Sequence, residues 1–453
     1  MIWISFAILI GVIAWSAASL RIDRGDALGI PFVAIGIFVF VYLVQPIQLI
    51  LTGSSELFLT QWQFAKALLV SALMLAFFMW GWLHPGEQRR SAGVPWDPRV
   101  MWNIGFVAAC VGLLLDVVFL ERSGGIAASF SESHGSAMAF KTNTAYLYDG
   151  PFLILSGSVM MMFGVVNSNG RWKRLMPYLF LLIPLATAIL TGSRGGFFQT
   201  GAIYFVGRSI ARRKRVNFGQ TVRMLLPLAV GVFVMVAYRG VLHLGPQTTE
   251  DVPSVETAYN DVAGVSEYGR EHGFVAQEFV YHAAVLDTVD QTGKLDYGIG
   301  WAEFLVINPI PKILWPEKPA RRDTEVTWDD IYEQTSITIA PGSAPGMVAD
   351  LYARFHLLSA IFFLLLGMGL RRLYVSACSL SSPVTAVGYV MFYAVSLNMF
   401  AQGFGSIFVP LGYSMAPAVF FAWLSRRRQA RAMSQQRQFA LRQFAATRIK
   451  QWS

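Results

Sequence analysis

Charged residues are scarce in this chain. Only 14% of its 453 residues are Asp, Glu, Lys or Arg, while 55% are hydrophobic, and soluble domains usually carry about 25% charged residues. The mean hydropathy of +0.48 points in the same direction. The composition therefore excludes a water-soluble globular protein and predicts an all-α polytopic membrane protein.

Cysteine and histidine are also rare, which limits the chemistry available to the chain. Cys110 and Cys378 both lie in or beside apolar runs, so we expect no disulfide framework. The six histidines are scattered, and Asp329 and Asp330 have no partner at ligand spacing. We therefore expect no metal site and no cofactor, and we interpret the acidic pair as solvated surface.

Long apolar runs, by contrast, are abundant. A helix needs roughly 20 apolar residues to cross a hydrocarbon core of about 30 Å. Eleven spans are predicted, at residues 2–20, 29–51, 64–83, 101–120, 147–166, 175–191, 195–207, 224–242, 347–370, 383–400 and 408–424. The first is expected to be a retained anchor, because Arg21 and Arg24 follow its apolar run instead of preceding it.

The distribution of charge predicts the orientation of these spans. An outer N-terminus places 24 of the 36 Lys and Arg residues on the inner side, and 17 of the 27 acidic residues in the outer stretch 243–346. This agrees with the positive-inside rule. The net charge of +9 is then explained by the membrane topology, and we expect no nucleic-acid partner. The basic cytoplasmic tail is either a solvated stop-transfer segment or a contact for anionic lipid.

The chain divides into four stretches without an internal repeat. They are eight spans in 1–242, a large periplasmic loop in 243–346, three spans in 347–424 and the tail 425–453. Within the loop, helical spacing predicts an amphipathic helix over 274–293. The proline-broken aromatic stretch 297–323, with Trp301 and Trp315, is expected to lie in the outer membrane interface.

Three arginines are predicted near the outer ends of spans. Arg194, in ILTGSRGGFF, stands between two apolar runs, where charge is costly and marks function by default. Gly195 admits a ligand close to the backbone, and the amides of the following helix add positive dipole. Arg239 and Arg354 complete the set. Guanidinium groups bind phosphate oxygens in pairs, so the set suits a membrane-anchored diphosphate. The alternative is that Arg194 and Arg239 are interfacial anchors.

Three motifs carry a family resemblance. The stretches LTGSRGGFF (190–198), PIPKILWPEKP (309–319) and APGMVADLYARFHLLSAIF (344–362) resemble signatures of the bacterial O-antigen polymerases, also called oligosaccharide repeat-unit polymerases. That family shows a Ser-Arg-Gly turn, a Pro-Arg-x-x-Trp-Pro-x-Lys-Pro run and an acidic-x-Tyr segment leading into Asn-Phe-Gly. This chain departs at Lys312, where the family often has arginine, and at ARFHLL, which replaces Asn-Phe-Gly.

The resemblance covers the last two-thirds of the chain and implies a metal-independent glycosyltransferase of the membrane C-type fold. Its donor would be an oligosaccharide on undecaprenyl diphosphate, and its acceptor another lipid-linked unit. The active site would face the periplasm at the inner membrane, with a chain-length regulator and a flippase as candidate partners. Lys318, in the Trp-Pro-x-Lys-Pro run, joins Arg194, Gly195, Arg239 and Arg354 as a candidate diphosphate ligand.

Such a transfer needs a base for the acceptor hydroxyl. Glu278 and His282 stand at i and i+4 on the predicted loop helix, so the carboxylate would orient the imidazole while it takes the proton. An ordinary surface pair is the alternative interpretation. Asp350, one turn before Arg354, is a competing base, or it orients that arginine.

Two other functions stay open at this point. An O-antigen ligase would use the same donor and diphosphate clamp but a different acceptor. A transporter or flippase of the same lipid-linked sugar would also place basic residues near the outer headgroups. It would not need an acid–base pair on a structured loop, and it would commonly show repeated halves.

The predicted topology is testable by cysteine labelling. We expect single cysteines at Ser254 and Asp330 to react with an impermeant reagent from outside, because the basic residues mark the other side as cytoplasmic. Cysteines at Lys214 and Arg437, in a background lacking the native cysteines, should react only after the membrane is opened. Outside labelling at position 214 would overturn the orientation.

Overall fold

A computed structural model describes most of the chain. The described residues are 1–22, 28–51, 53, 58–86, 96–122, 149–165, 170–190, 194–214, 216, 219, 274–275, 278–306, 310, 315, 326–339, 344–380 and 382–452. The helices of the first half are α1 (Ile2–Ile22), α2 (Ile30–Val39), η1 (Phe40–Val44), α3 (Gln45–Leu51), α5 (Gln61–Leu83), α6 (Pro98–Arg122), α10 (Gly150–Gly164), α11 (Arg171–Leu190), α12 (Arg194–Ala202), η2 (Ile203–Gly207) and α13 (Arg208–Ala211).

The second half adds further helices and one pair of short strands. In order these are β1 (Phe274–Val275), α17 (Glu278–Thr292), α18 (Ile299–Val306), α19 (Trp328–Thr335), β2 (Thr338–Ile339), α20 (Gly346–Phe355), η3 (His356–Leu358), α21 (Ser359–Ser379), α22 (Pro383–Gln402), η4 (Phe404–Ile407) and α23 (Phe408–Trp452). The strands pair in parallel, Phe274 with Thr338. The all-α prediction is confirmed, with these two-residue strands as its exception in the described part.

Eight of the predicted spans coincide with helices long and apolar enough to cross a membrane. These are Ile2–Leu20, Ile30–Leu51, Gln61–Leu83, Pro98–Arg122, Arg171–Ile189, Gly346–Ser379, Pro383–Gln402 and Phe404–Arg428. The prediction of a polytopic membrane protein is therefore confirmed.

The three remaining predicted spans differ from these eight. The span predicted at 147–166 contains α10, whose 15 residues rise about 22 Å, short of a full crossing. The span predicted at 195–207 corresponds to α12, η2 and α13, which follow one another without a gap. The span predicted at 224–242 lies outside the described residues.

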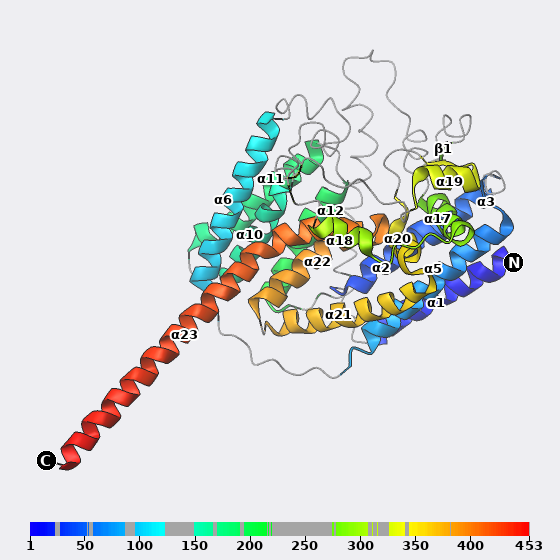
Figure 1. The fold of residues 1–453 in the computed structure, drawn as a ribbon. Helices are drawn as coiled ribbons and strands as arrows, with labels where there is room; N and C mark the ends of the chain where they lie inside the picture. Colours follow the sequence, from blue (N-terminus) through cyan, green and yellow to red (C-terminus); the bar gives the residue numbers. More distant parts are fainter. Residues whose placement is uncertain are drawn as a thin grey trace.

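The two termini lie at opposite ends of the molecule. Figure 1 shows the N-terminus at the end where α3, α17 and α19 gather, while α23 runs away from the bundle toward the other end. Helix α23 continues unbroken from its apolar part into the basic tail.

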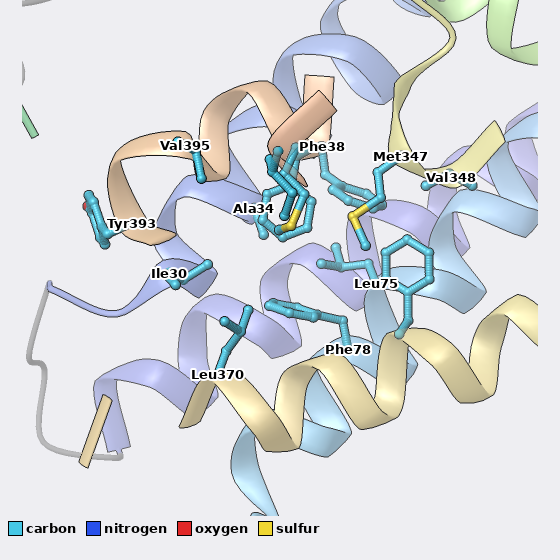
Figure 2. Packing of buried hydrophobic residues seen from close by; sticks show 14 of the residues in the cluster. Ile30, Ala34, Phe38, Leu75, Phe78, Met347, Val348, Leu370, Tyr393 and Val395 are labelled. Atoms are coloured by element: carbon cyan, nitrogen blue, oxygen red, sulfur yellow. The ribbon is translucent and has the colours of Figure 1, made fainter. Parts of the chain in front are cut away.

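The buried core joins helices that are far apart in sequence. Ile30, Ala34 and Phe38 of α2 lie against Leu75 and Phe78 of α5 and against residues of α20, α21 and α22 (Figure 2). Phe78 packs edge to face on Phe400, with ring centroids 5.5 Å apart. This core sets the position of α20, the helix that carries the candidate site.

Glycines allow α6 and α10 to touch backbone to backbone. A Cβ added at Gly105 would lie 2.7 Å from the Gly157 carbonyl oxygen, and one at Gly157 would lie 2.4 Å from the Gly105 carbonyl oxygen. Gly112 and Gly150 approach in the same way further along the two helices. A Cβ added at Gly112 would lie 2.7 Å from the Gly150 carbonyl oxygen. Small residues at a helix interface let the two backbones approach closely in a membrane.

Gly157→Ala should therefore destabilise the bundle. The new methyl group would overlap the α6 backbone, so the two helices would have to separate and lose packing contacts. We expect a lower thermal unfolding midpoint of the detergent-solubilised protein. Gly36→Ala, in α2, is the matched control because nothing lies within 4 Å of its added Cβ. Equal midpoints for the two variants would contradict the close α6–α10 contact.

Candidate functional site

Helix α20 and the first residue of η3 carry two polar pairs, each spaced by four residues. Asp350 and Arg354 form one i,i+4 pair, and Tyr352 and His356 form the other. The segment at the end of α17 supplies a carboxylate to each: Asp296 contacts Arg354, and Asp290 contacts Tyr352 and His356. The site therefore consists of two clusters along α20 and its junction with η3.

The Arg354 cluster is a largely buried ion group. Its guanidinium donates from Nε to Asp350 Oδ1 at 3.0 Å and from a terminal nitrogen to Asp296, whose side chain is 3% exposed. The guanidinium also lies over the Trp301 ring, 4.9 Å from the ring centroid. Two carboxylates thus neutralise and orient the single positive charge.

The carboxylate of Asp350 has further donors. Its Oδ2 accepts hydrogen bonds from the backbone N–H of Phe404 at 2.8 Å and of Gly405 at 3.4 Å. The turn that presents these amides needs Gly403, whose φ of +122° is rarely open to other residues and whose added Cβ would lie 3.2 Å from Asp350. Both carboxylate oxygens of Asp350 therefore accept hydrogen bonds. Of its two predicted roles, this geometry matches the orientation of Arg354.

Trp301 lies inside the protein, which corrects the prediction for this residue. It is 9% exposed and packs against Phe355, Phe362, Phe404 and Phe408. An anchor in the membrane interface would instead present its ring to lipid. The ring is buried because it forms the floor on which the Arg354 guanidinium stacks. Trp315, 38% exposed, remains accessible.

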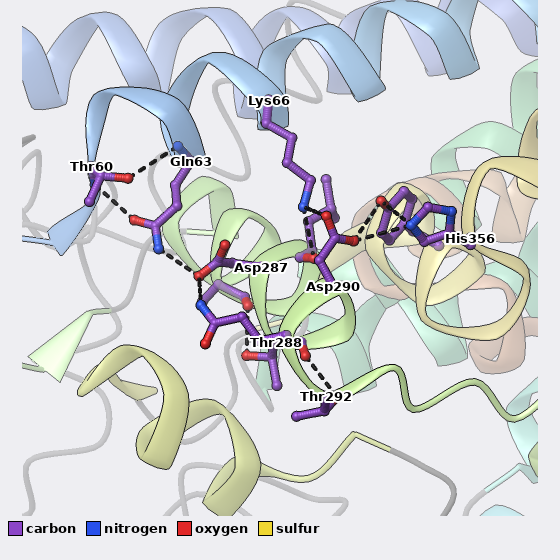
Figure 3. A network of polar contacts seen from close by, with 12 residues as sticks. Thr60, Gln63, Lys66, Asp287, Thr288, Asp290, Thr292 and His356 are labelled. Carbon is purple, nitrogen blue, oxygen red and sulfur yellow. Dashed lines mark hydrogen bonds and ion pairs between the residues drawn. The ribbon is translucent and has the colours of Figure 1, made fainter.

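The second cluster joins α5, α17 and α20 (Figure 3). Lys66 forms an ion pair with Asp290, and Asp290 Oδ1 accepts from the Tyr352 hydroxyl at 2.8 Å and lies 3.1 Å from His356 Nε2. Partial burial alone would raise the pKa of Asp290, but the hydrogen bonds from Lys66 and Tyr352 lower it below its usual value. Asp290 is therefore ionised, and its carboxylate can orient Tyr352 and His356.

His356 has an unusual backbone conformation. Its φ is +50° and its ψ is −136°, a region that favours glycine. Non-glycine residues in such conformations cost on the order of 1–3 kcal/mol and persist only where surrounding contacts hold them. Here the Tyr352 hydroxyl and Asp290 hold the imidazole, which is 41% exposed.

The predicted catalytic pair, Glu278 and His282, has a different geometry from the one expected. Glu278 pairs with Gln45, while His282 Nε2 lies 3.3 Å from the Ser71 hydroxyl and packs edge-on against Tyr42. His282 is fully buried, and burial lowers its pKa to about 3. An imidazole that stays neutral and unreachable is a poor base near neutral pH. Both the catalytic pair and the surface-pair alternative are therefore wrong for His282.

Their helix is also more enclosed than predicted. Helix α17 buries residues on nearly all sides, among them Phe279, Val280, Tyr281, Ala283 and Leu286. It contacts α5, α19 and α20. The predicted amphipathic helix thus becomes an internal element, with its polar edge at Asp287 and Asp290 directed at α5 (Figure 3).

The Arg-Gly part of the Ser-Arg-Gly motif begins α12. Arg194 is the first residue of that helix, although its side chain is outside what the structure describes. A Cβ added at Gly195 would lie 2.9 Å from Asn398 Oδ1 in α22, so the first turn of α12 packs directly on α22. The other predicted diphosphate ligands, Arg239 and Lys318, lie outside the described residues.

Asp330 is not the solvated residue that the sequence suggested. Its carboxylate forms a capping box with Thr327 at the start of α19 and an ion pair with Lys294 at 2.6 Å. The prediction of solvated surface is therefore corrected for Asp330, because it has a structural role at a helix N-terminus.

Sequence reasoning missed Lys66, Asp290, Asp296 and His356. One signal was available: Lys66 is the only charged residue of the predicted span 64–83, and such residues are functional candidates by default. The replacement of glycine by His356 in the DLYARFH motif was a second signal. The two aspartates carry no local signal, because only the return of the chain after α17 brings them to α20.

Buried His282 should make the fold sensitive to acid. The unfolded chain binds a proton near pH 6.5, while the folded protein resists it down to about 3. Stability is therefore lost as the pH falls through this window, by roughly 2 kcal/mol between pH 6.5 and 5 at about 1.4 kcal/mol per unit. We expect His282→Leu to reduce the drop in thermal midpoint between pH 7.5 and 5, measured in detergent.

The control for this experiment is Val285→Ala, a core substitution on the same helix. It should lower the midpoint at both pH values without changing the difference between them. An unchanged acid sensitivity in His282→Leu would show that other groups cause it.

Comparison with known proteins adds no relative. The chain matches no family model, no curated protein and no solved structure. Its function has to be inferred from the arrangement of its own side chains.

Proposed function

We propose that this protein is a glycosyltransferase that joins lipid-linked oligosaccharide repeat units at the outer face of a bacterial cytoplasmic membrane. The donor would be an oligosaccharide on undecaprenyl diphosphate, and the acceptor a second lipid-linked unit. The proposal builds on the resemblance of three motifs to the repeat-unit polymerases, with two of the motifs now located in the fold.

One observation carries the proposal: these two motifs meet at the end of α22. Gly195 of the Ser-Arg-Gly turn packs on Asn398, and Asp350 of the acidic-x-Tyr segment packs on Gly403. Asn398 and Gly403 are five residues apart, about 7 Å along the helix axis. Motifs separated by 155 residues, from 195 to 350, thus contribute to one region of the bundle.

The chemistry of this region suits a departing diphosphate. The first backbone amides of α12, which begins at Arg194, carry the partial positive charge of a helix N-terminus. Negative charge grows on the lipid diphosphate as the sugar–phosphate bond breaks, so donors placed there stabilise the transition state more than the ground state. Arg354 is held by two carboxylates, so its role is that of an oriented hydrogen-bond donor.

The decisive assay uses purified protein and native lipid-linked repeat units. A repeat-unit polymerase yields a ladder of lengthened lipid-linked glycans. A ligase would leave the units unextended and transfer them to another lipid acceptor. A transporter would move them across a vesicle membrane without lengthening them. The absence of a ladder from active, folded protein would contradict the proposal.

Arg194 variants test the diphosphate clamp. Loss of one such donor typically costs about 10²- to 10³-fold in rate, so we expect that loss for Arg194→Ala. Arg194→Lys should recover little, because an ammonium keeps the charge but not the two-pronged geometry. Ladder formation is compared at equal levels of inserted protein, with the exposed Arg99→Ala as control.

The two variants test different parts of the proposed diphosphate clamp. Full activity in Arg194→Lys would rule out bidentate binding, since lysine also reaches the interface as an anchor. Full activity in Arg194→Ala would remove Arg194 from the mechanism.

A further inference from the structure

His356 lies at the junction of α20 and α21, within the candidate span Gly346–Ser379. Helix α20 ends at Phe355 and α21 begins at Ser359, and between them Leu357 and Leu358 are 51% and 64% exposed. The imidazole, with its side chain 41% exposed, is accessible at this junction.

The contacts of His356 determine which ring nitrogen carries a proton. Asp290 is ionised and can only accept, and the one hydroxyl hydrogen of Tyr352 is donated to it at 2.8 Å. His356 Nε2 lies 2.7 Å from the Tyr352 oxygen and 3.1 Å from Asp290 Oδ1, so the hydrogen in both contacts belongs to Nε2. In the neutral ring Nδ1 is then unprotonated, and within the described part of the chain it makes no hydrogen bond.

We propose that His356, oriented by Asp290, is the general base that deprotonates the acceptor sugar in the glycosyl transfer; this rests on the proposed function. The acceptor hydroxyl gives its proton to Nδ1 as its oxygen bonds to the anomeric carbon of the donor. The bond from that carbon to the diphosphate breaks, and its electron pair leaves with the lipid diphosphate. The imidazolium then loses its proton to water. The carboxylate stabilises the imidazolium while it exists.

The backbone conformation at position 356 helps to distinguish a catalytic role of His356 from a purely structural one. Its φ of +50° favours glycine, which would adopt this backbone with less strain than histidine. The chain instead keeps an imidazole there, restrained by Tyr352 and Asp290. Residues with strained backbones of this kind cluster at functional sites.

The experiment replaces His356 by glycine. His356→Gly removes the base and relieves the backbone, so the variant should unfold at the same temperature as the wild type or a higher one. Ladder formation from lipid-linked repeat units should fall by about 10²- to 10⁴-fold, the usual contribution of a positioned base. Added imidazole should restore part of the rate by entering the vacated space, a rescue that a structural role would not give.

Two further variants sharpen the result. Asp290→Asn keeps the imidazole but removes the carboxylate, so transfer should slow and imidazole should not help. His84→Gly, at an exposed histidine on the end of α5, is the control and should retain full activity.

The failures are distinguishable. A folded wild type that makes no ladder contradicts the proposed function itself. If the wild type makes a ladder, the base assignment is overturned by any of three results. These are a wild-type rate in His356→Gly, a lost rate that imidazole does not recover, or failure of His356→Gly to fold.

Discussion

The ion-paired guanidinium of Arg354 is the interaction on which the arrangement of the site depends. It ties α20 to the segment after α17 through Asp296, to α18 through Trp301 and, by way of Asp350, to the amides that open η4. Breaking a buried pair by removing one partner typically costs about 3–5 kcal/mol, because the remaining charge is left uncompensated. These contacts therefore fix the positions of the four segments relative to one another.

Close backbone contacts make this arrangement possible inside a membrane bundle. An added Cβ at Gly81 or Gly367 would overlap the carbonyl oxygen of Leu364 or Phe78, so α5 and α21 touch as closely as α6 and α10 do. Lipid supplies no hydrophobic drive between helices, and close packing of small residues replaces it. Lys66 on α5 reaches Asp290 because α5 is held against the helices that flank the site.

Individual site residues were readable from the sequence only where they carried a local signal. Asp350, Arg354 and Gly195 stand in motifs beside apolar spans, so charge and glycine in an unexpected place singled them out. His282 also drew attention through its i,i+4 spacing to Glu278, yet spacing says nothing about burial. The structure buries His282 under Tyr42 and leaves His356 accessible.

The sequence by itself determined the class of protein and eight of its spans, because apolar length and scarcity of charge follow directly from the cost of placing polar groups in hydrocarbon. Only the tertiary structure decided which side chains meet. Asp290 and Asp296 reach Tyr352, His356 and Arg354 from some sixty residues away in the chain. Such contacts depend on the packing of α17 against α5 and α20, a long-range property that no local pattern of residues encodes.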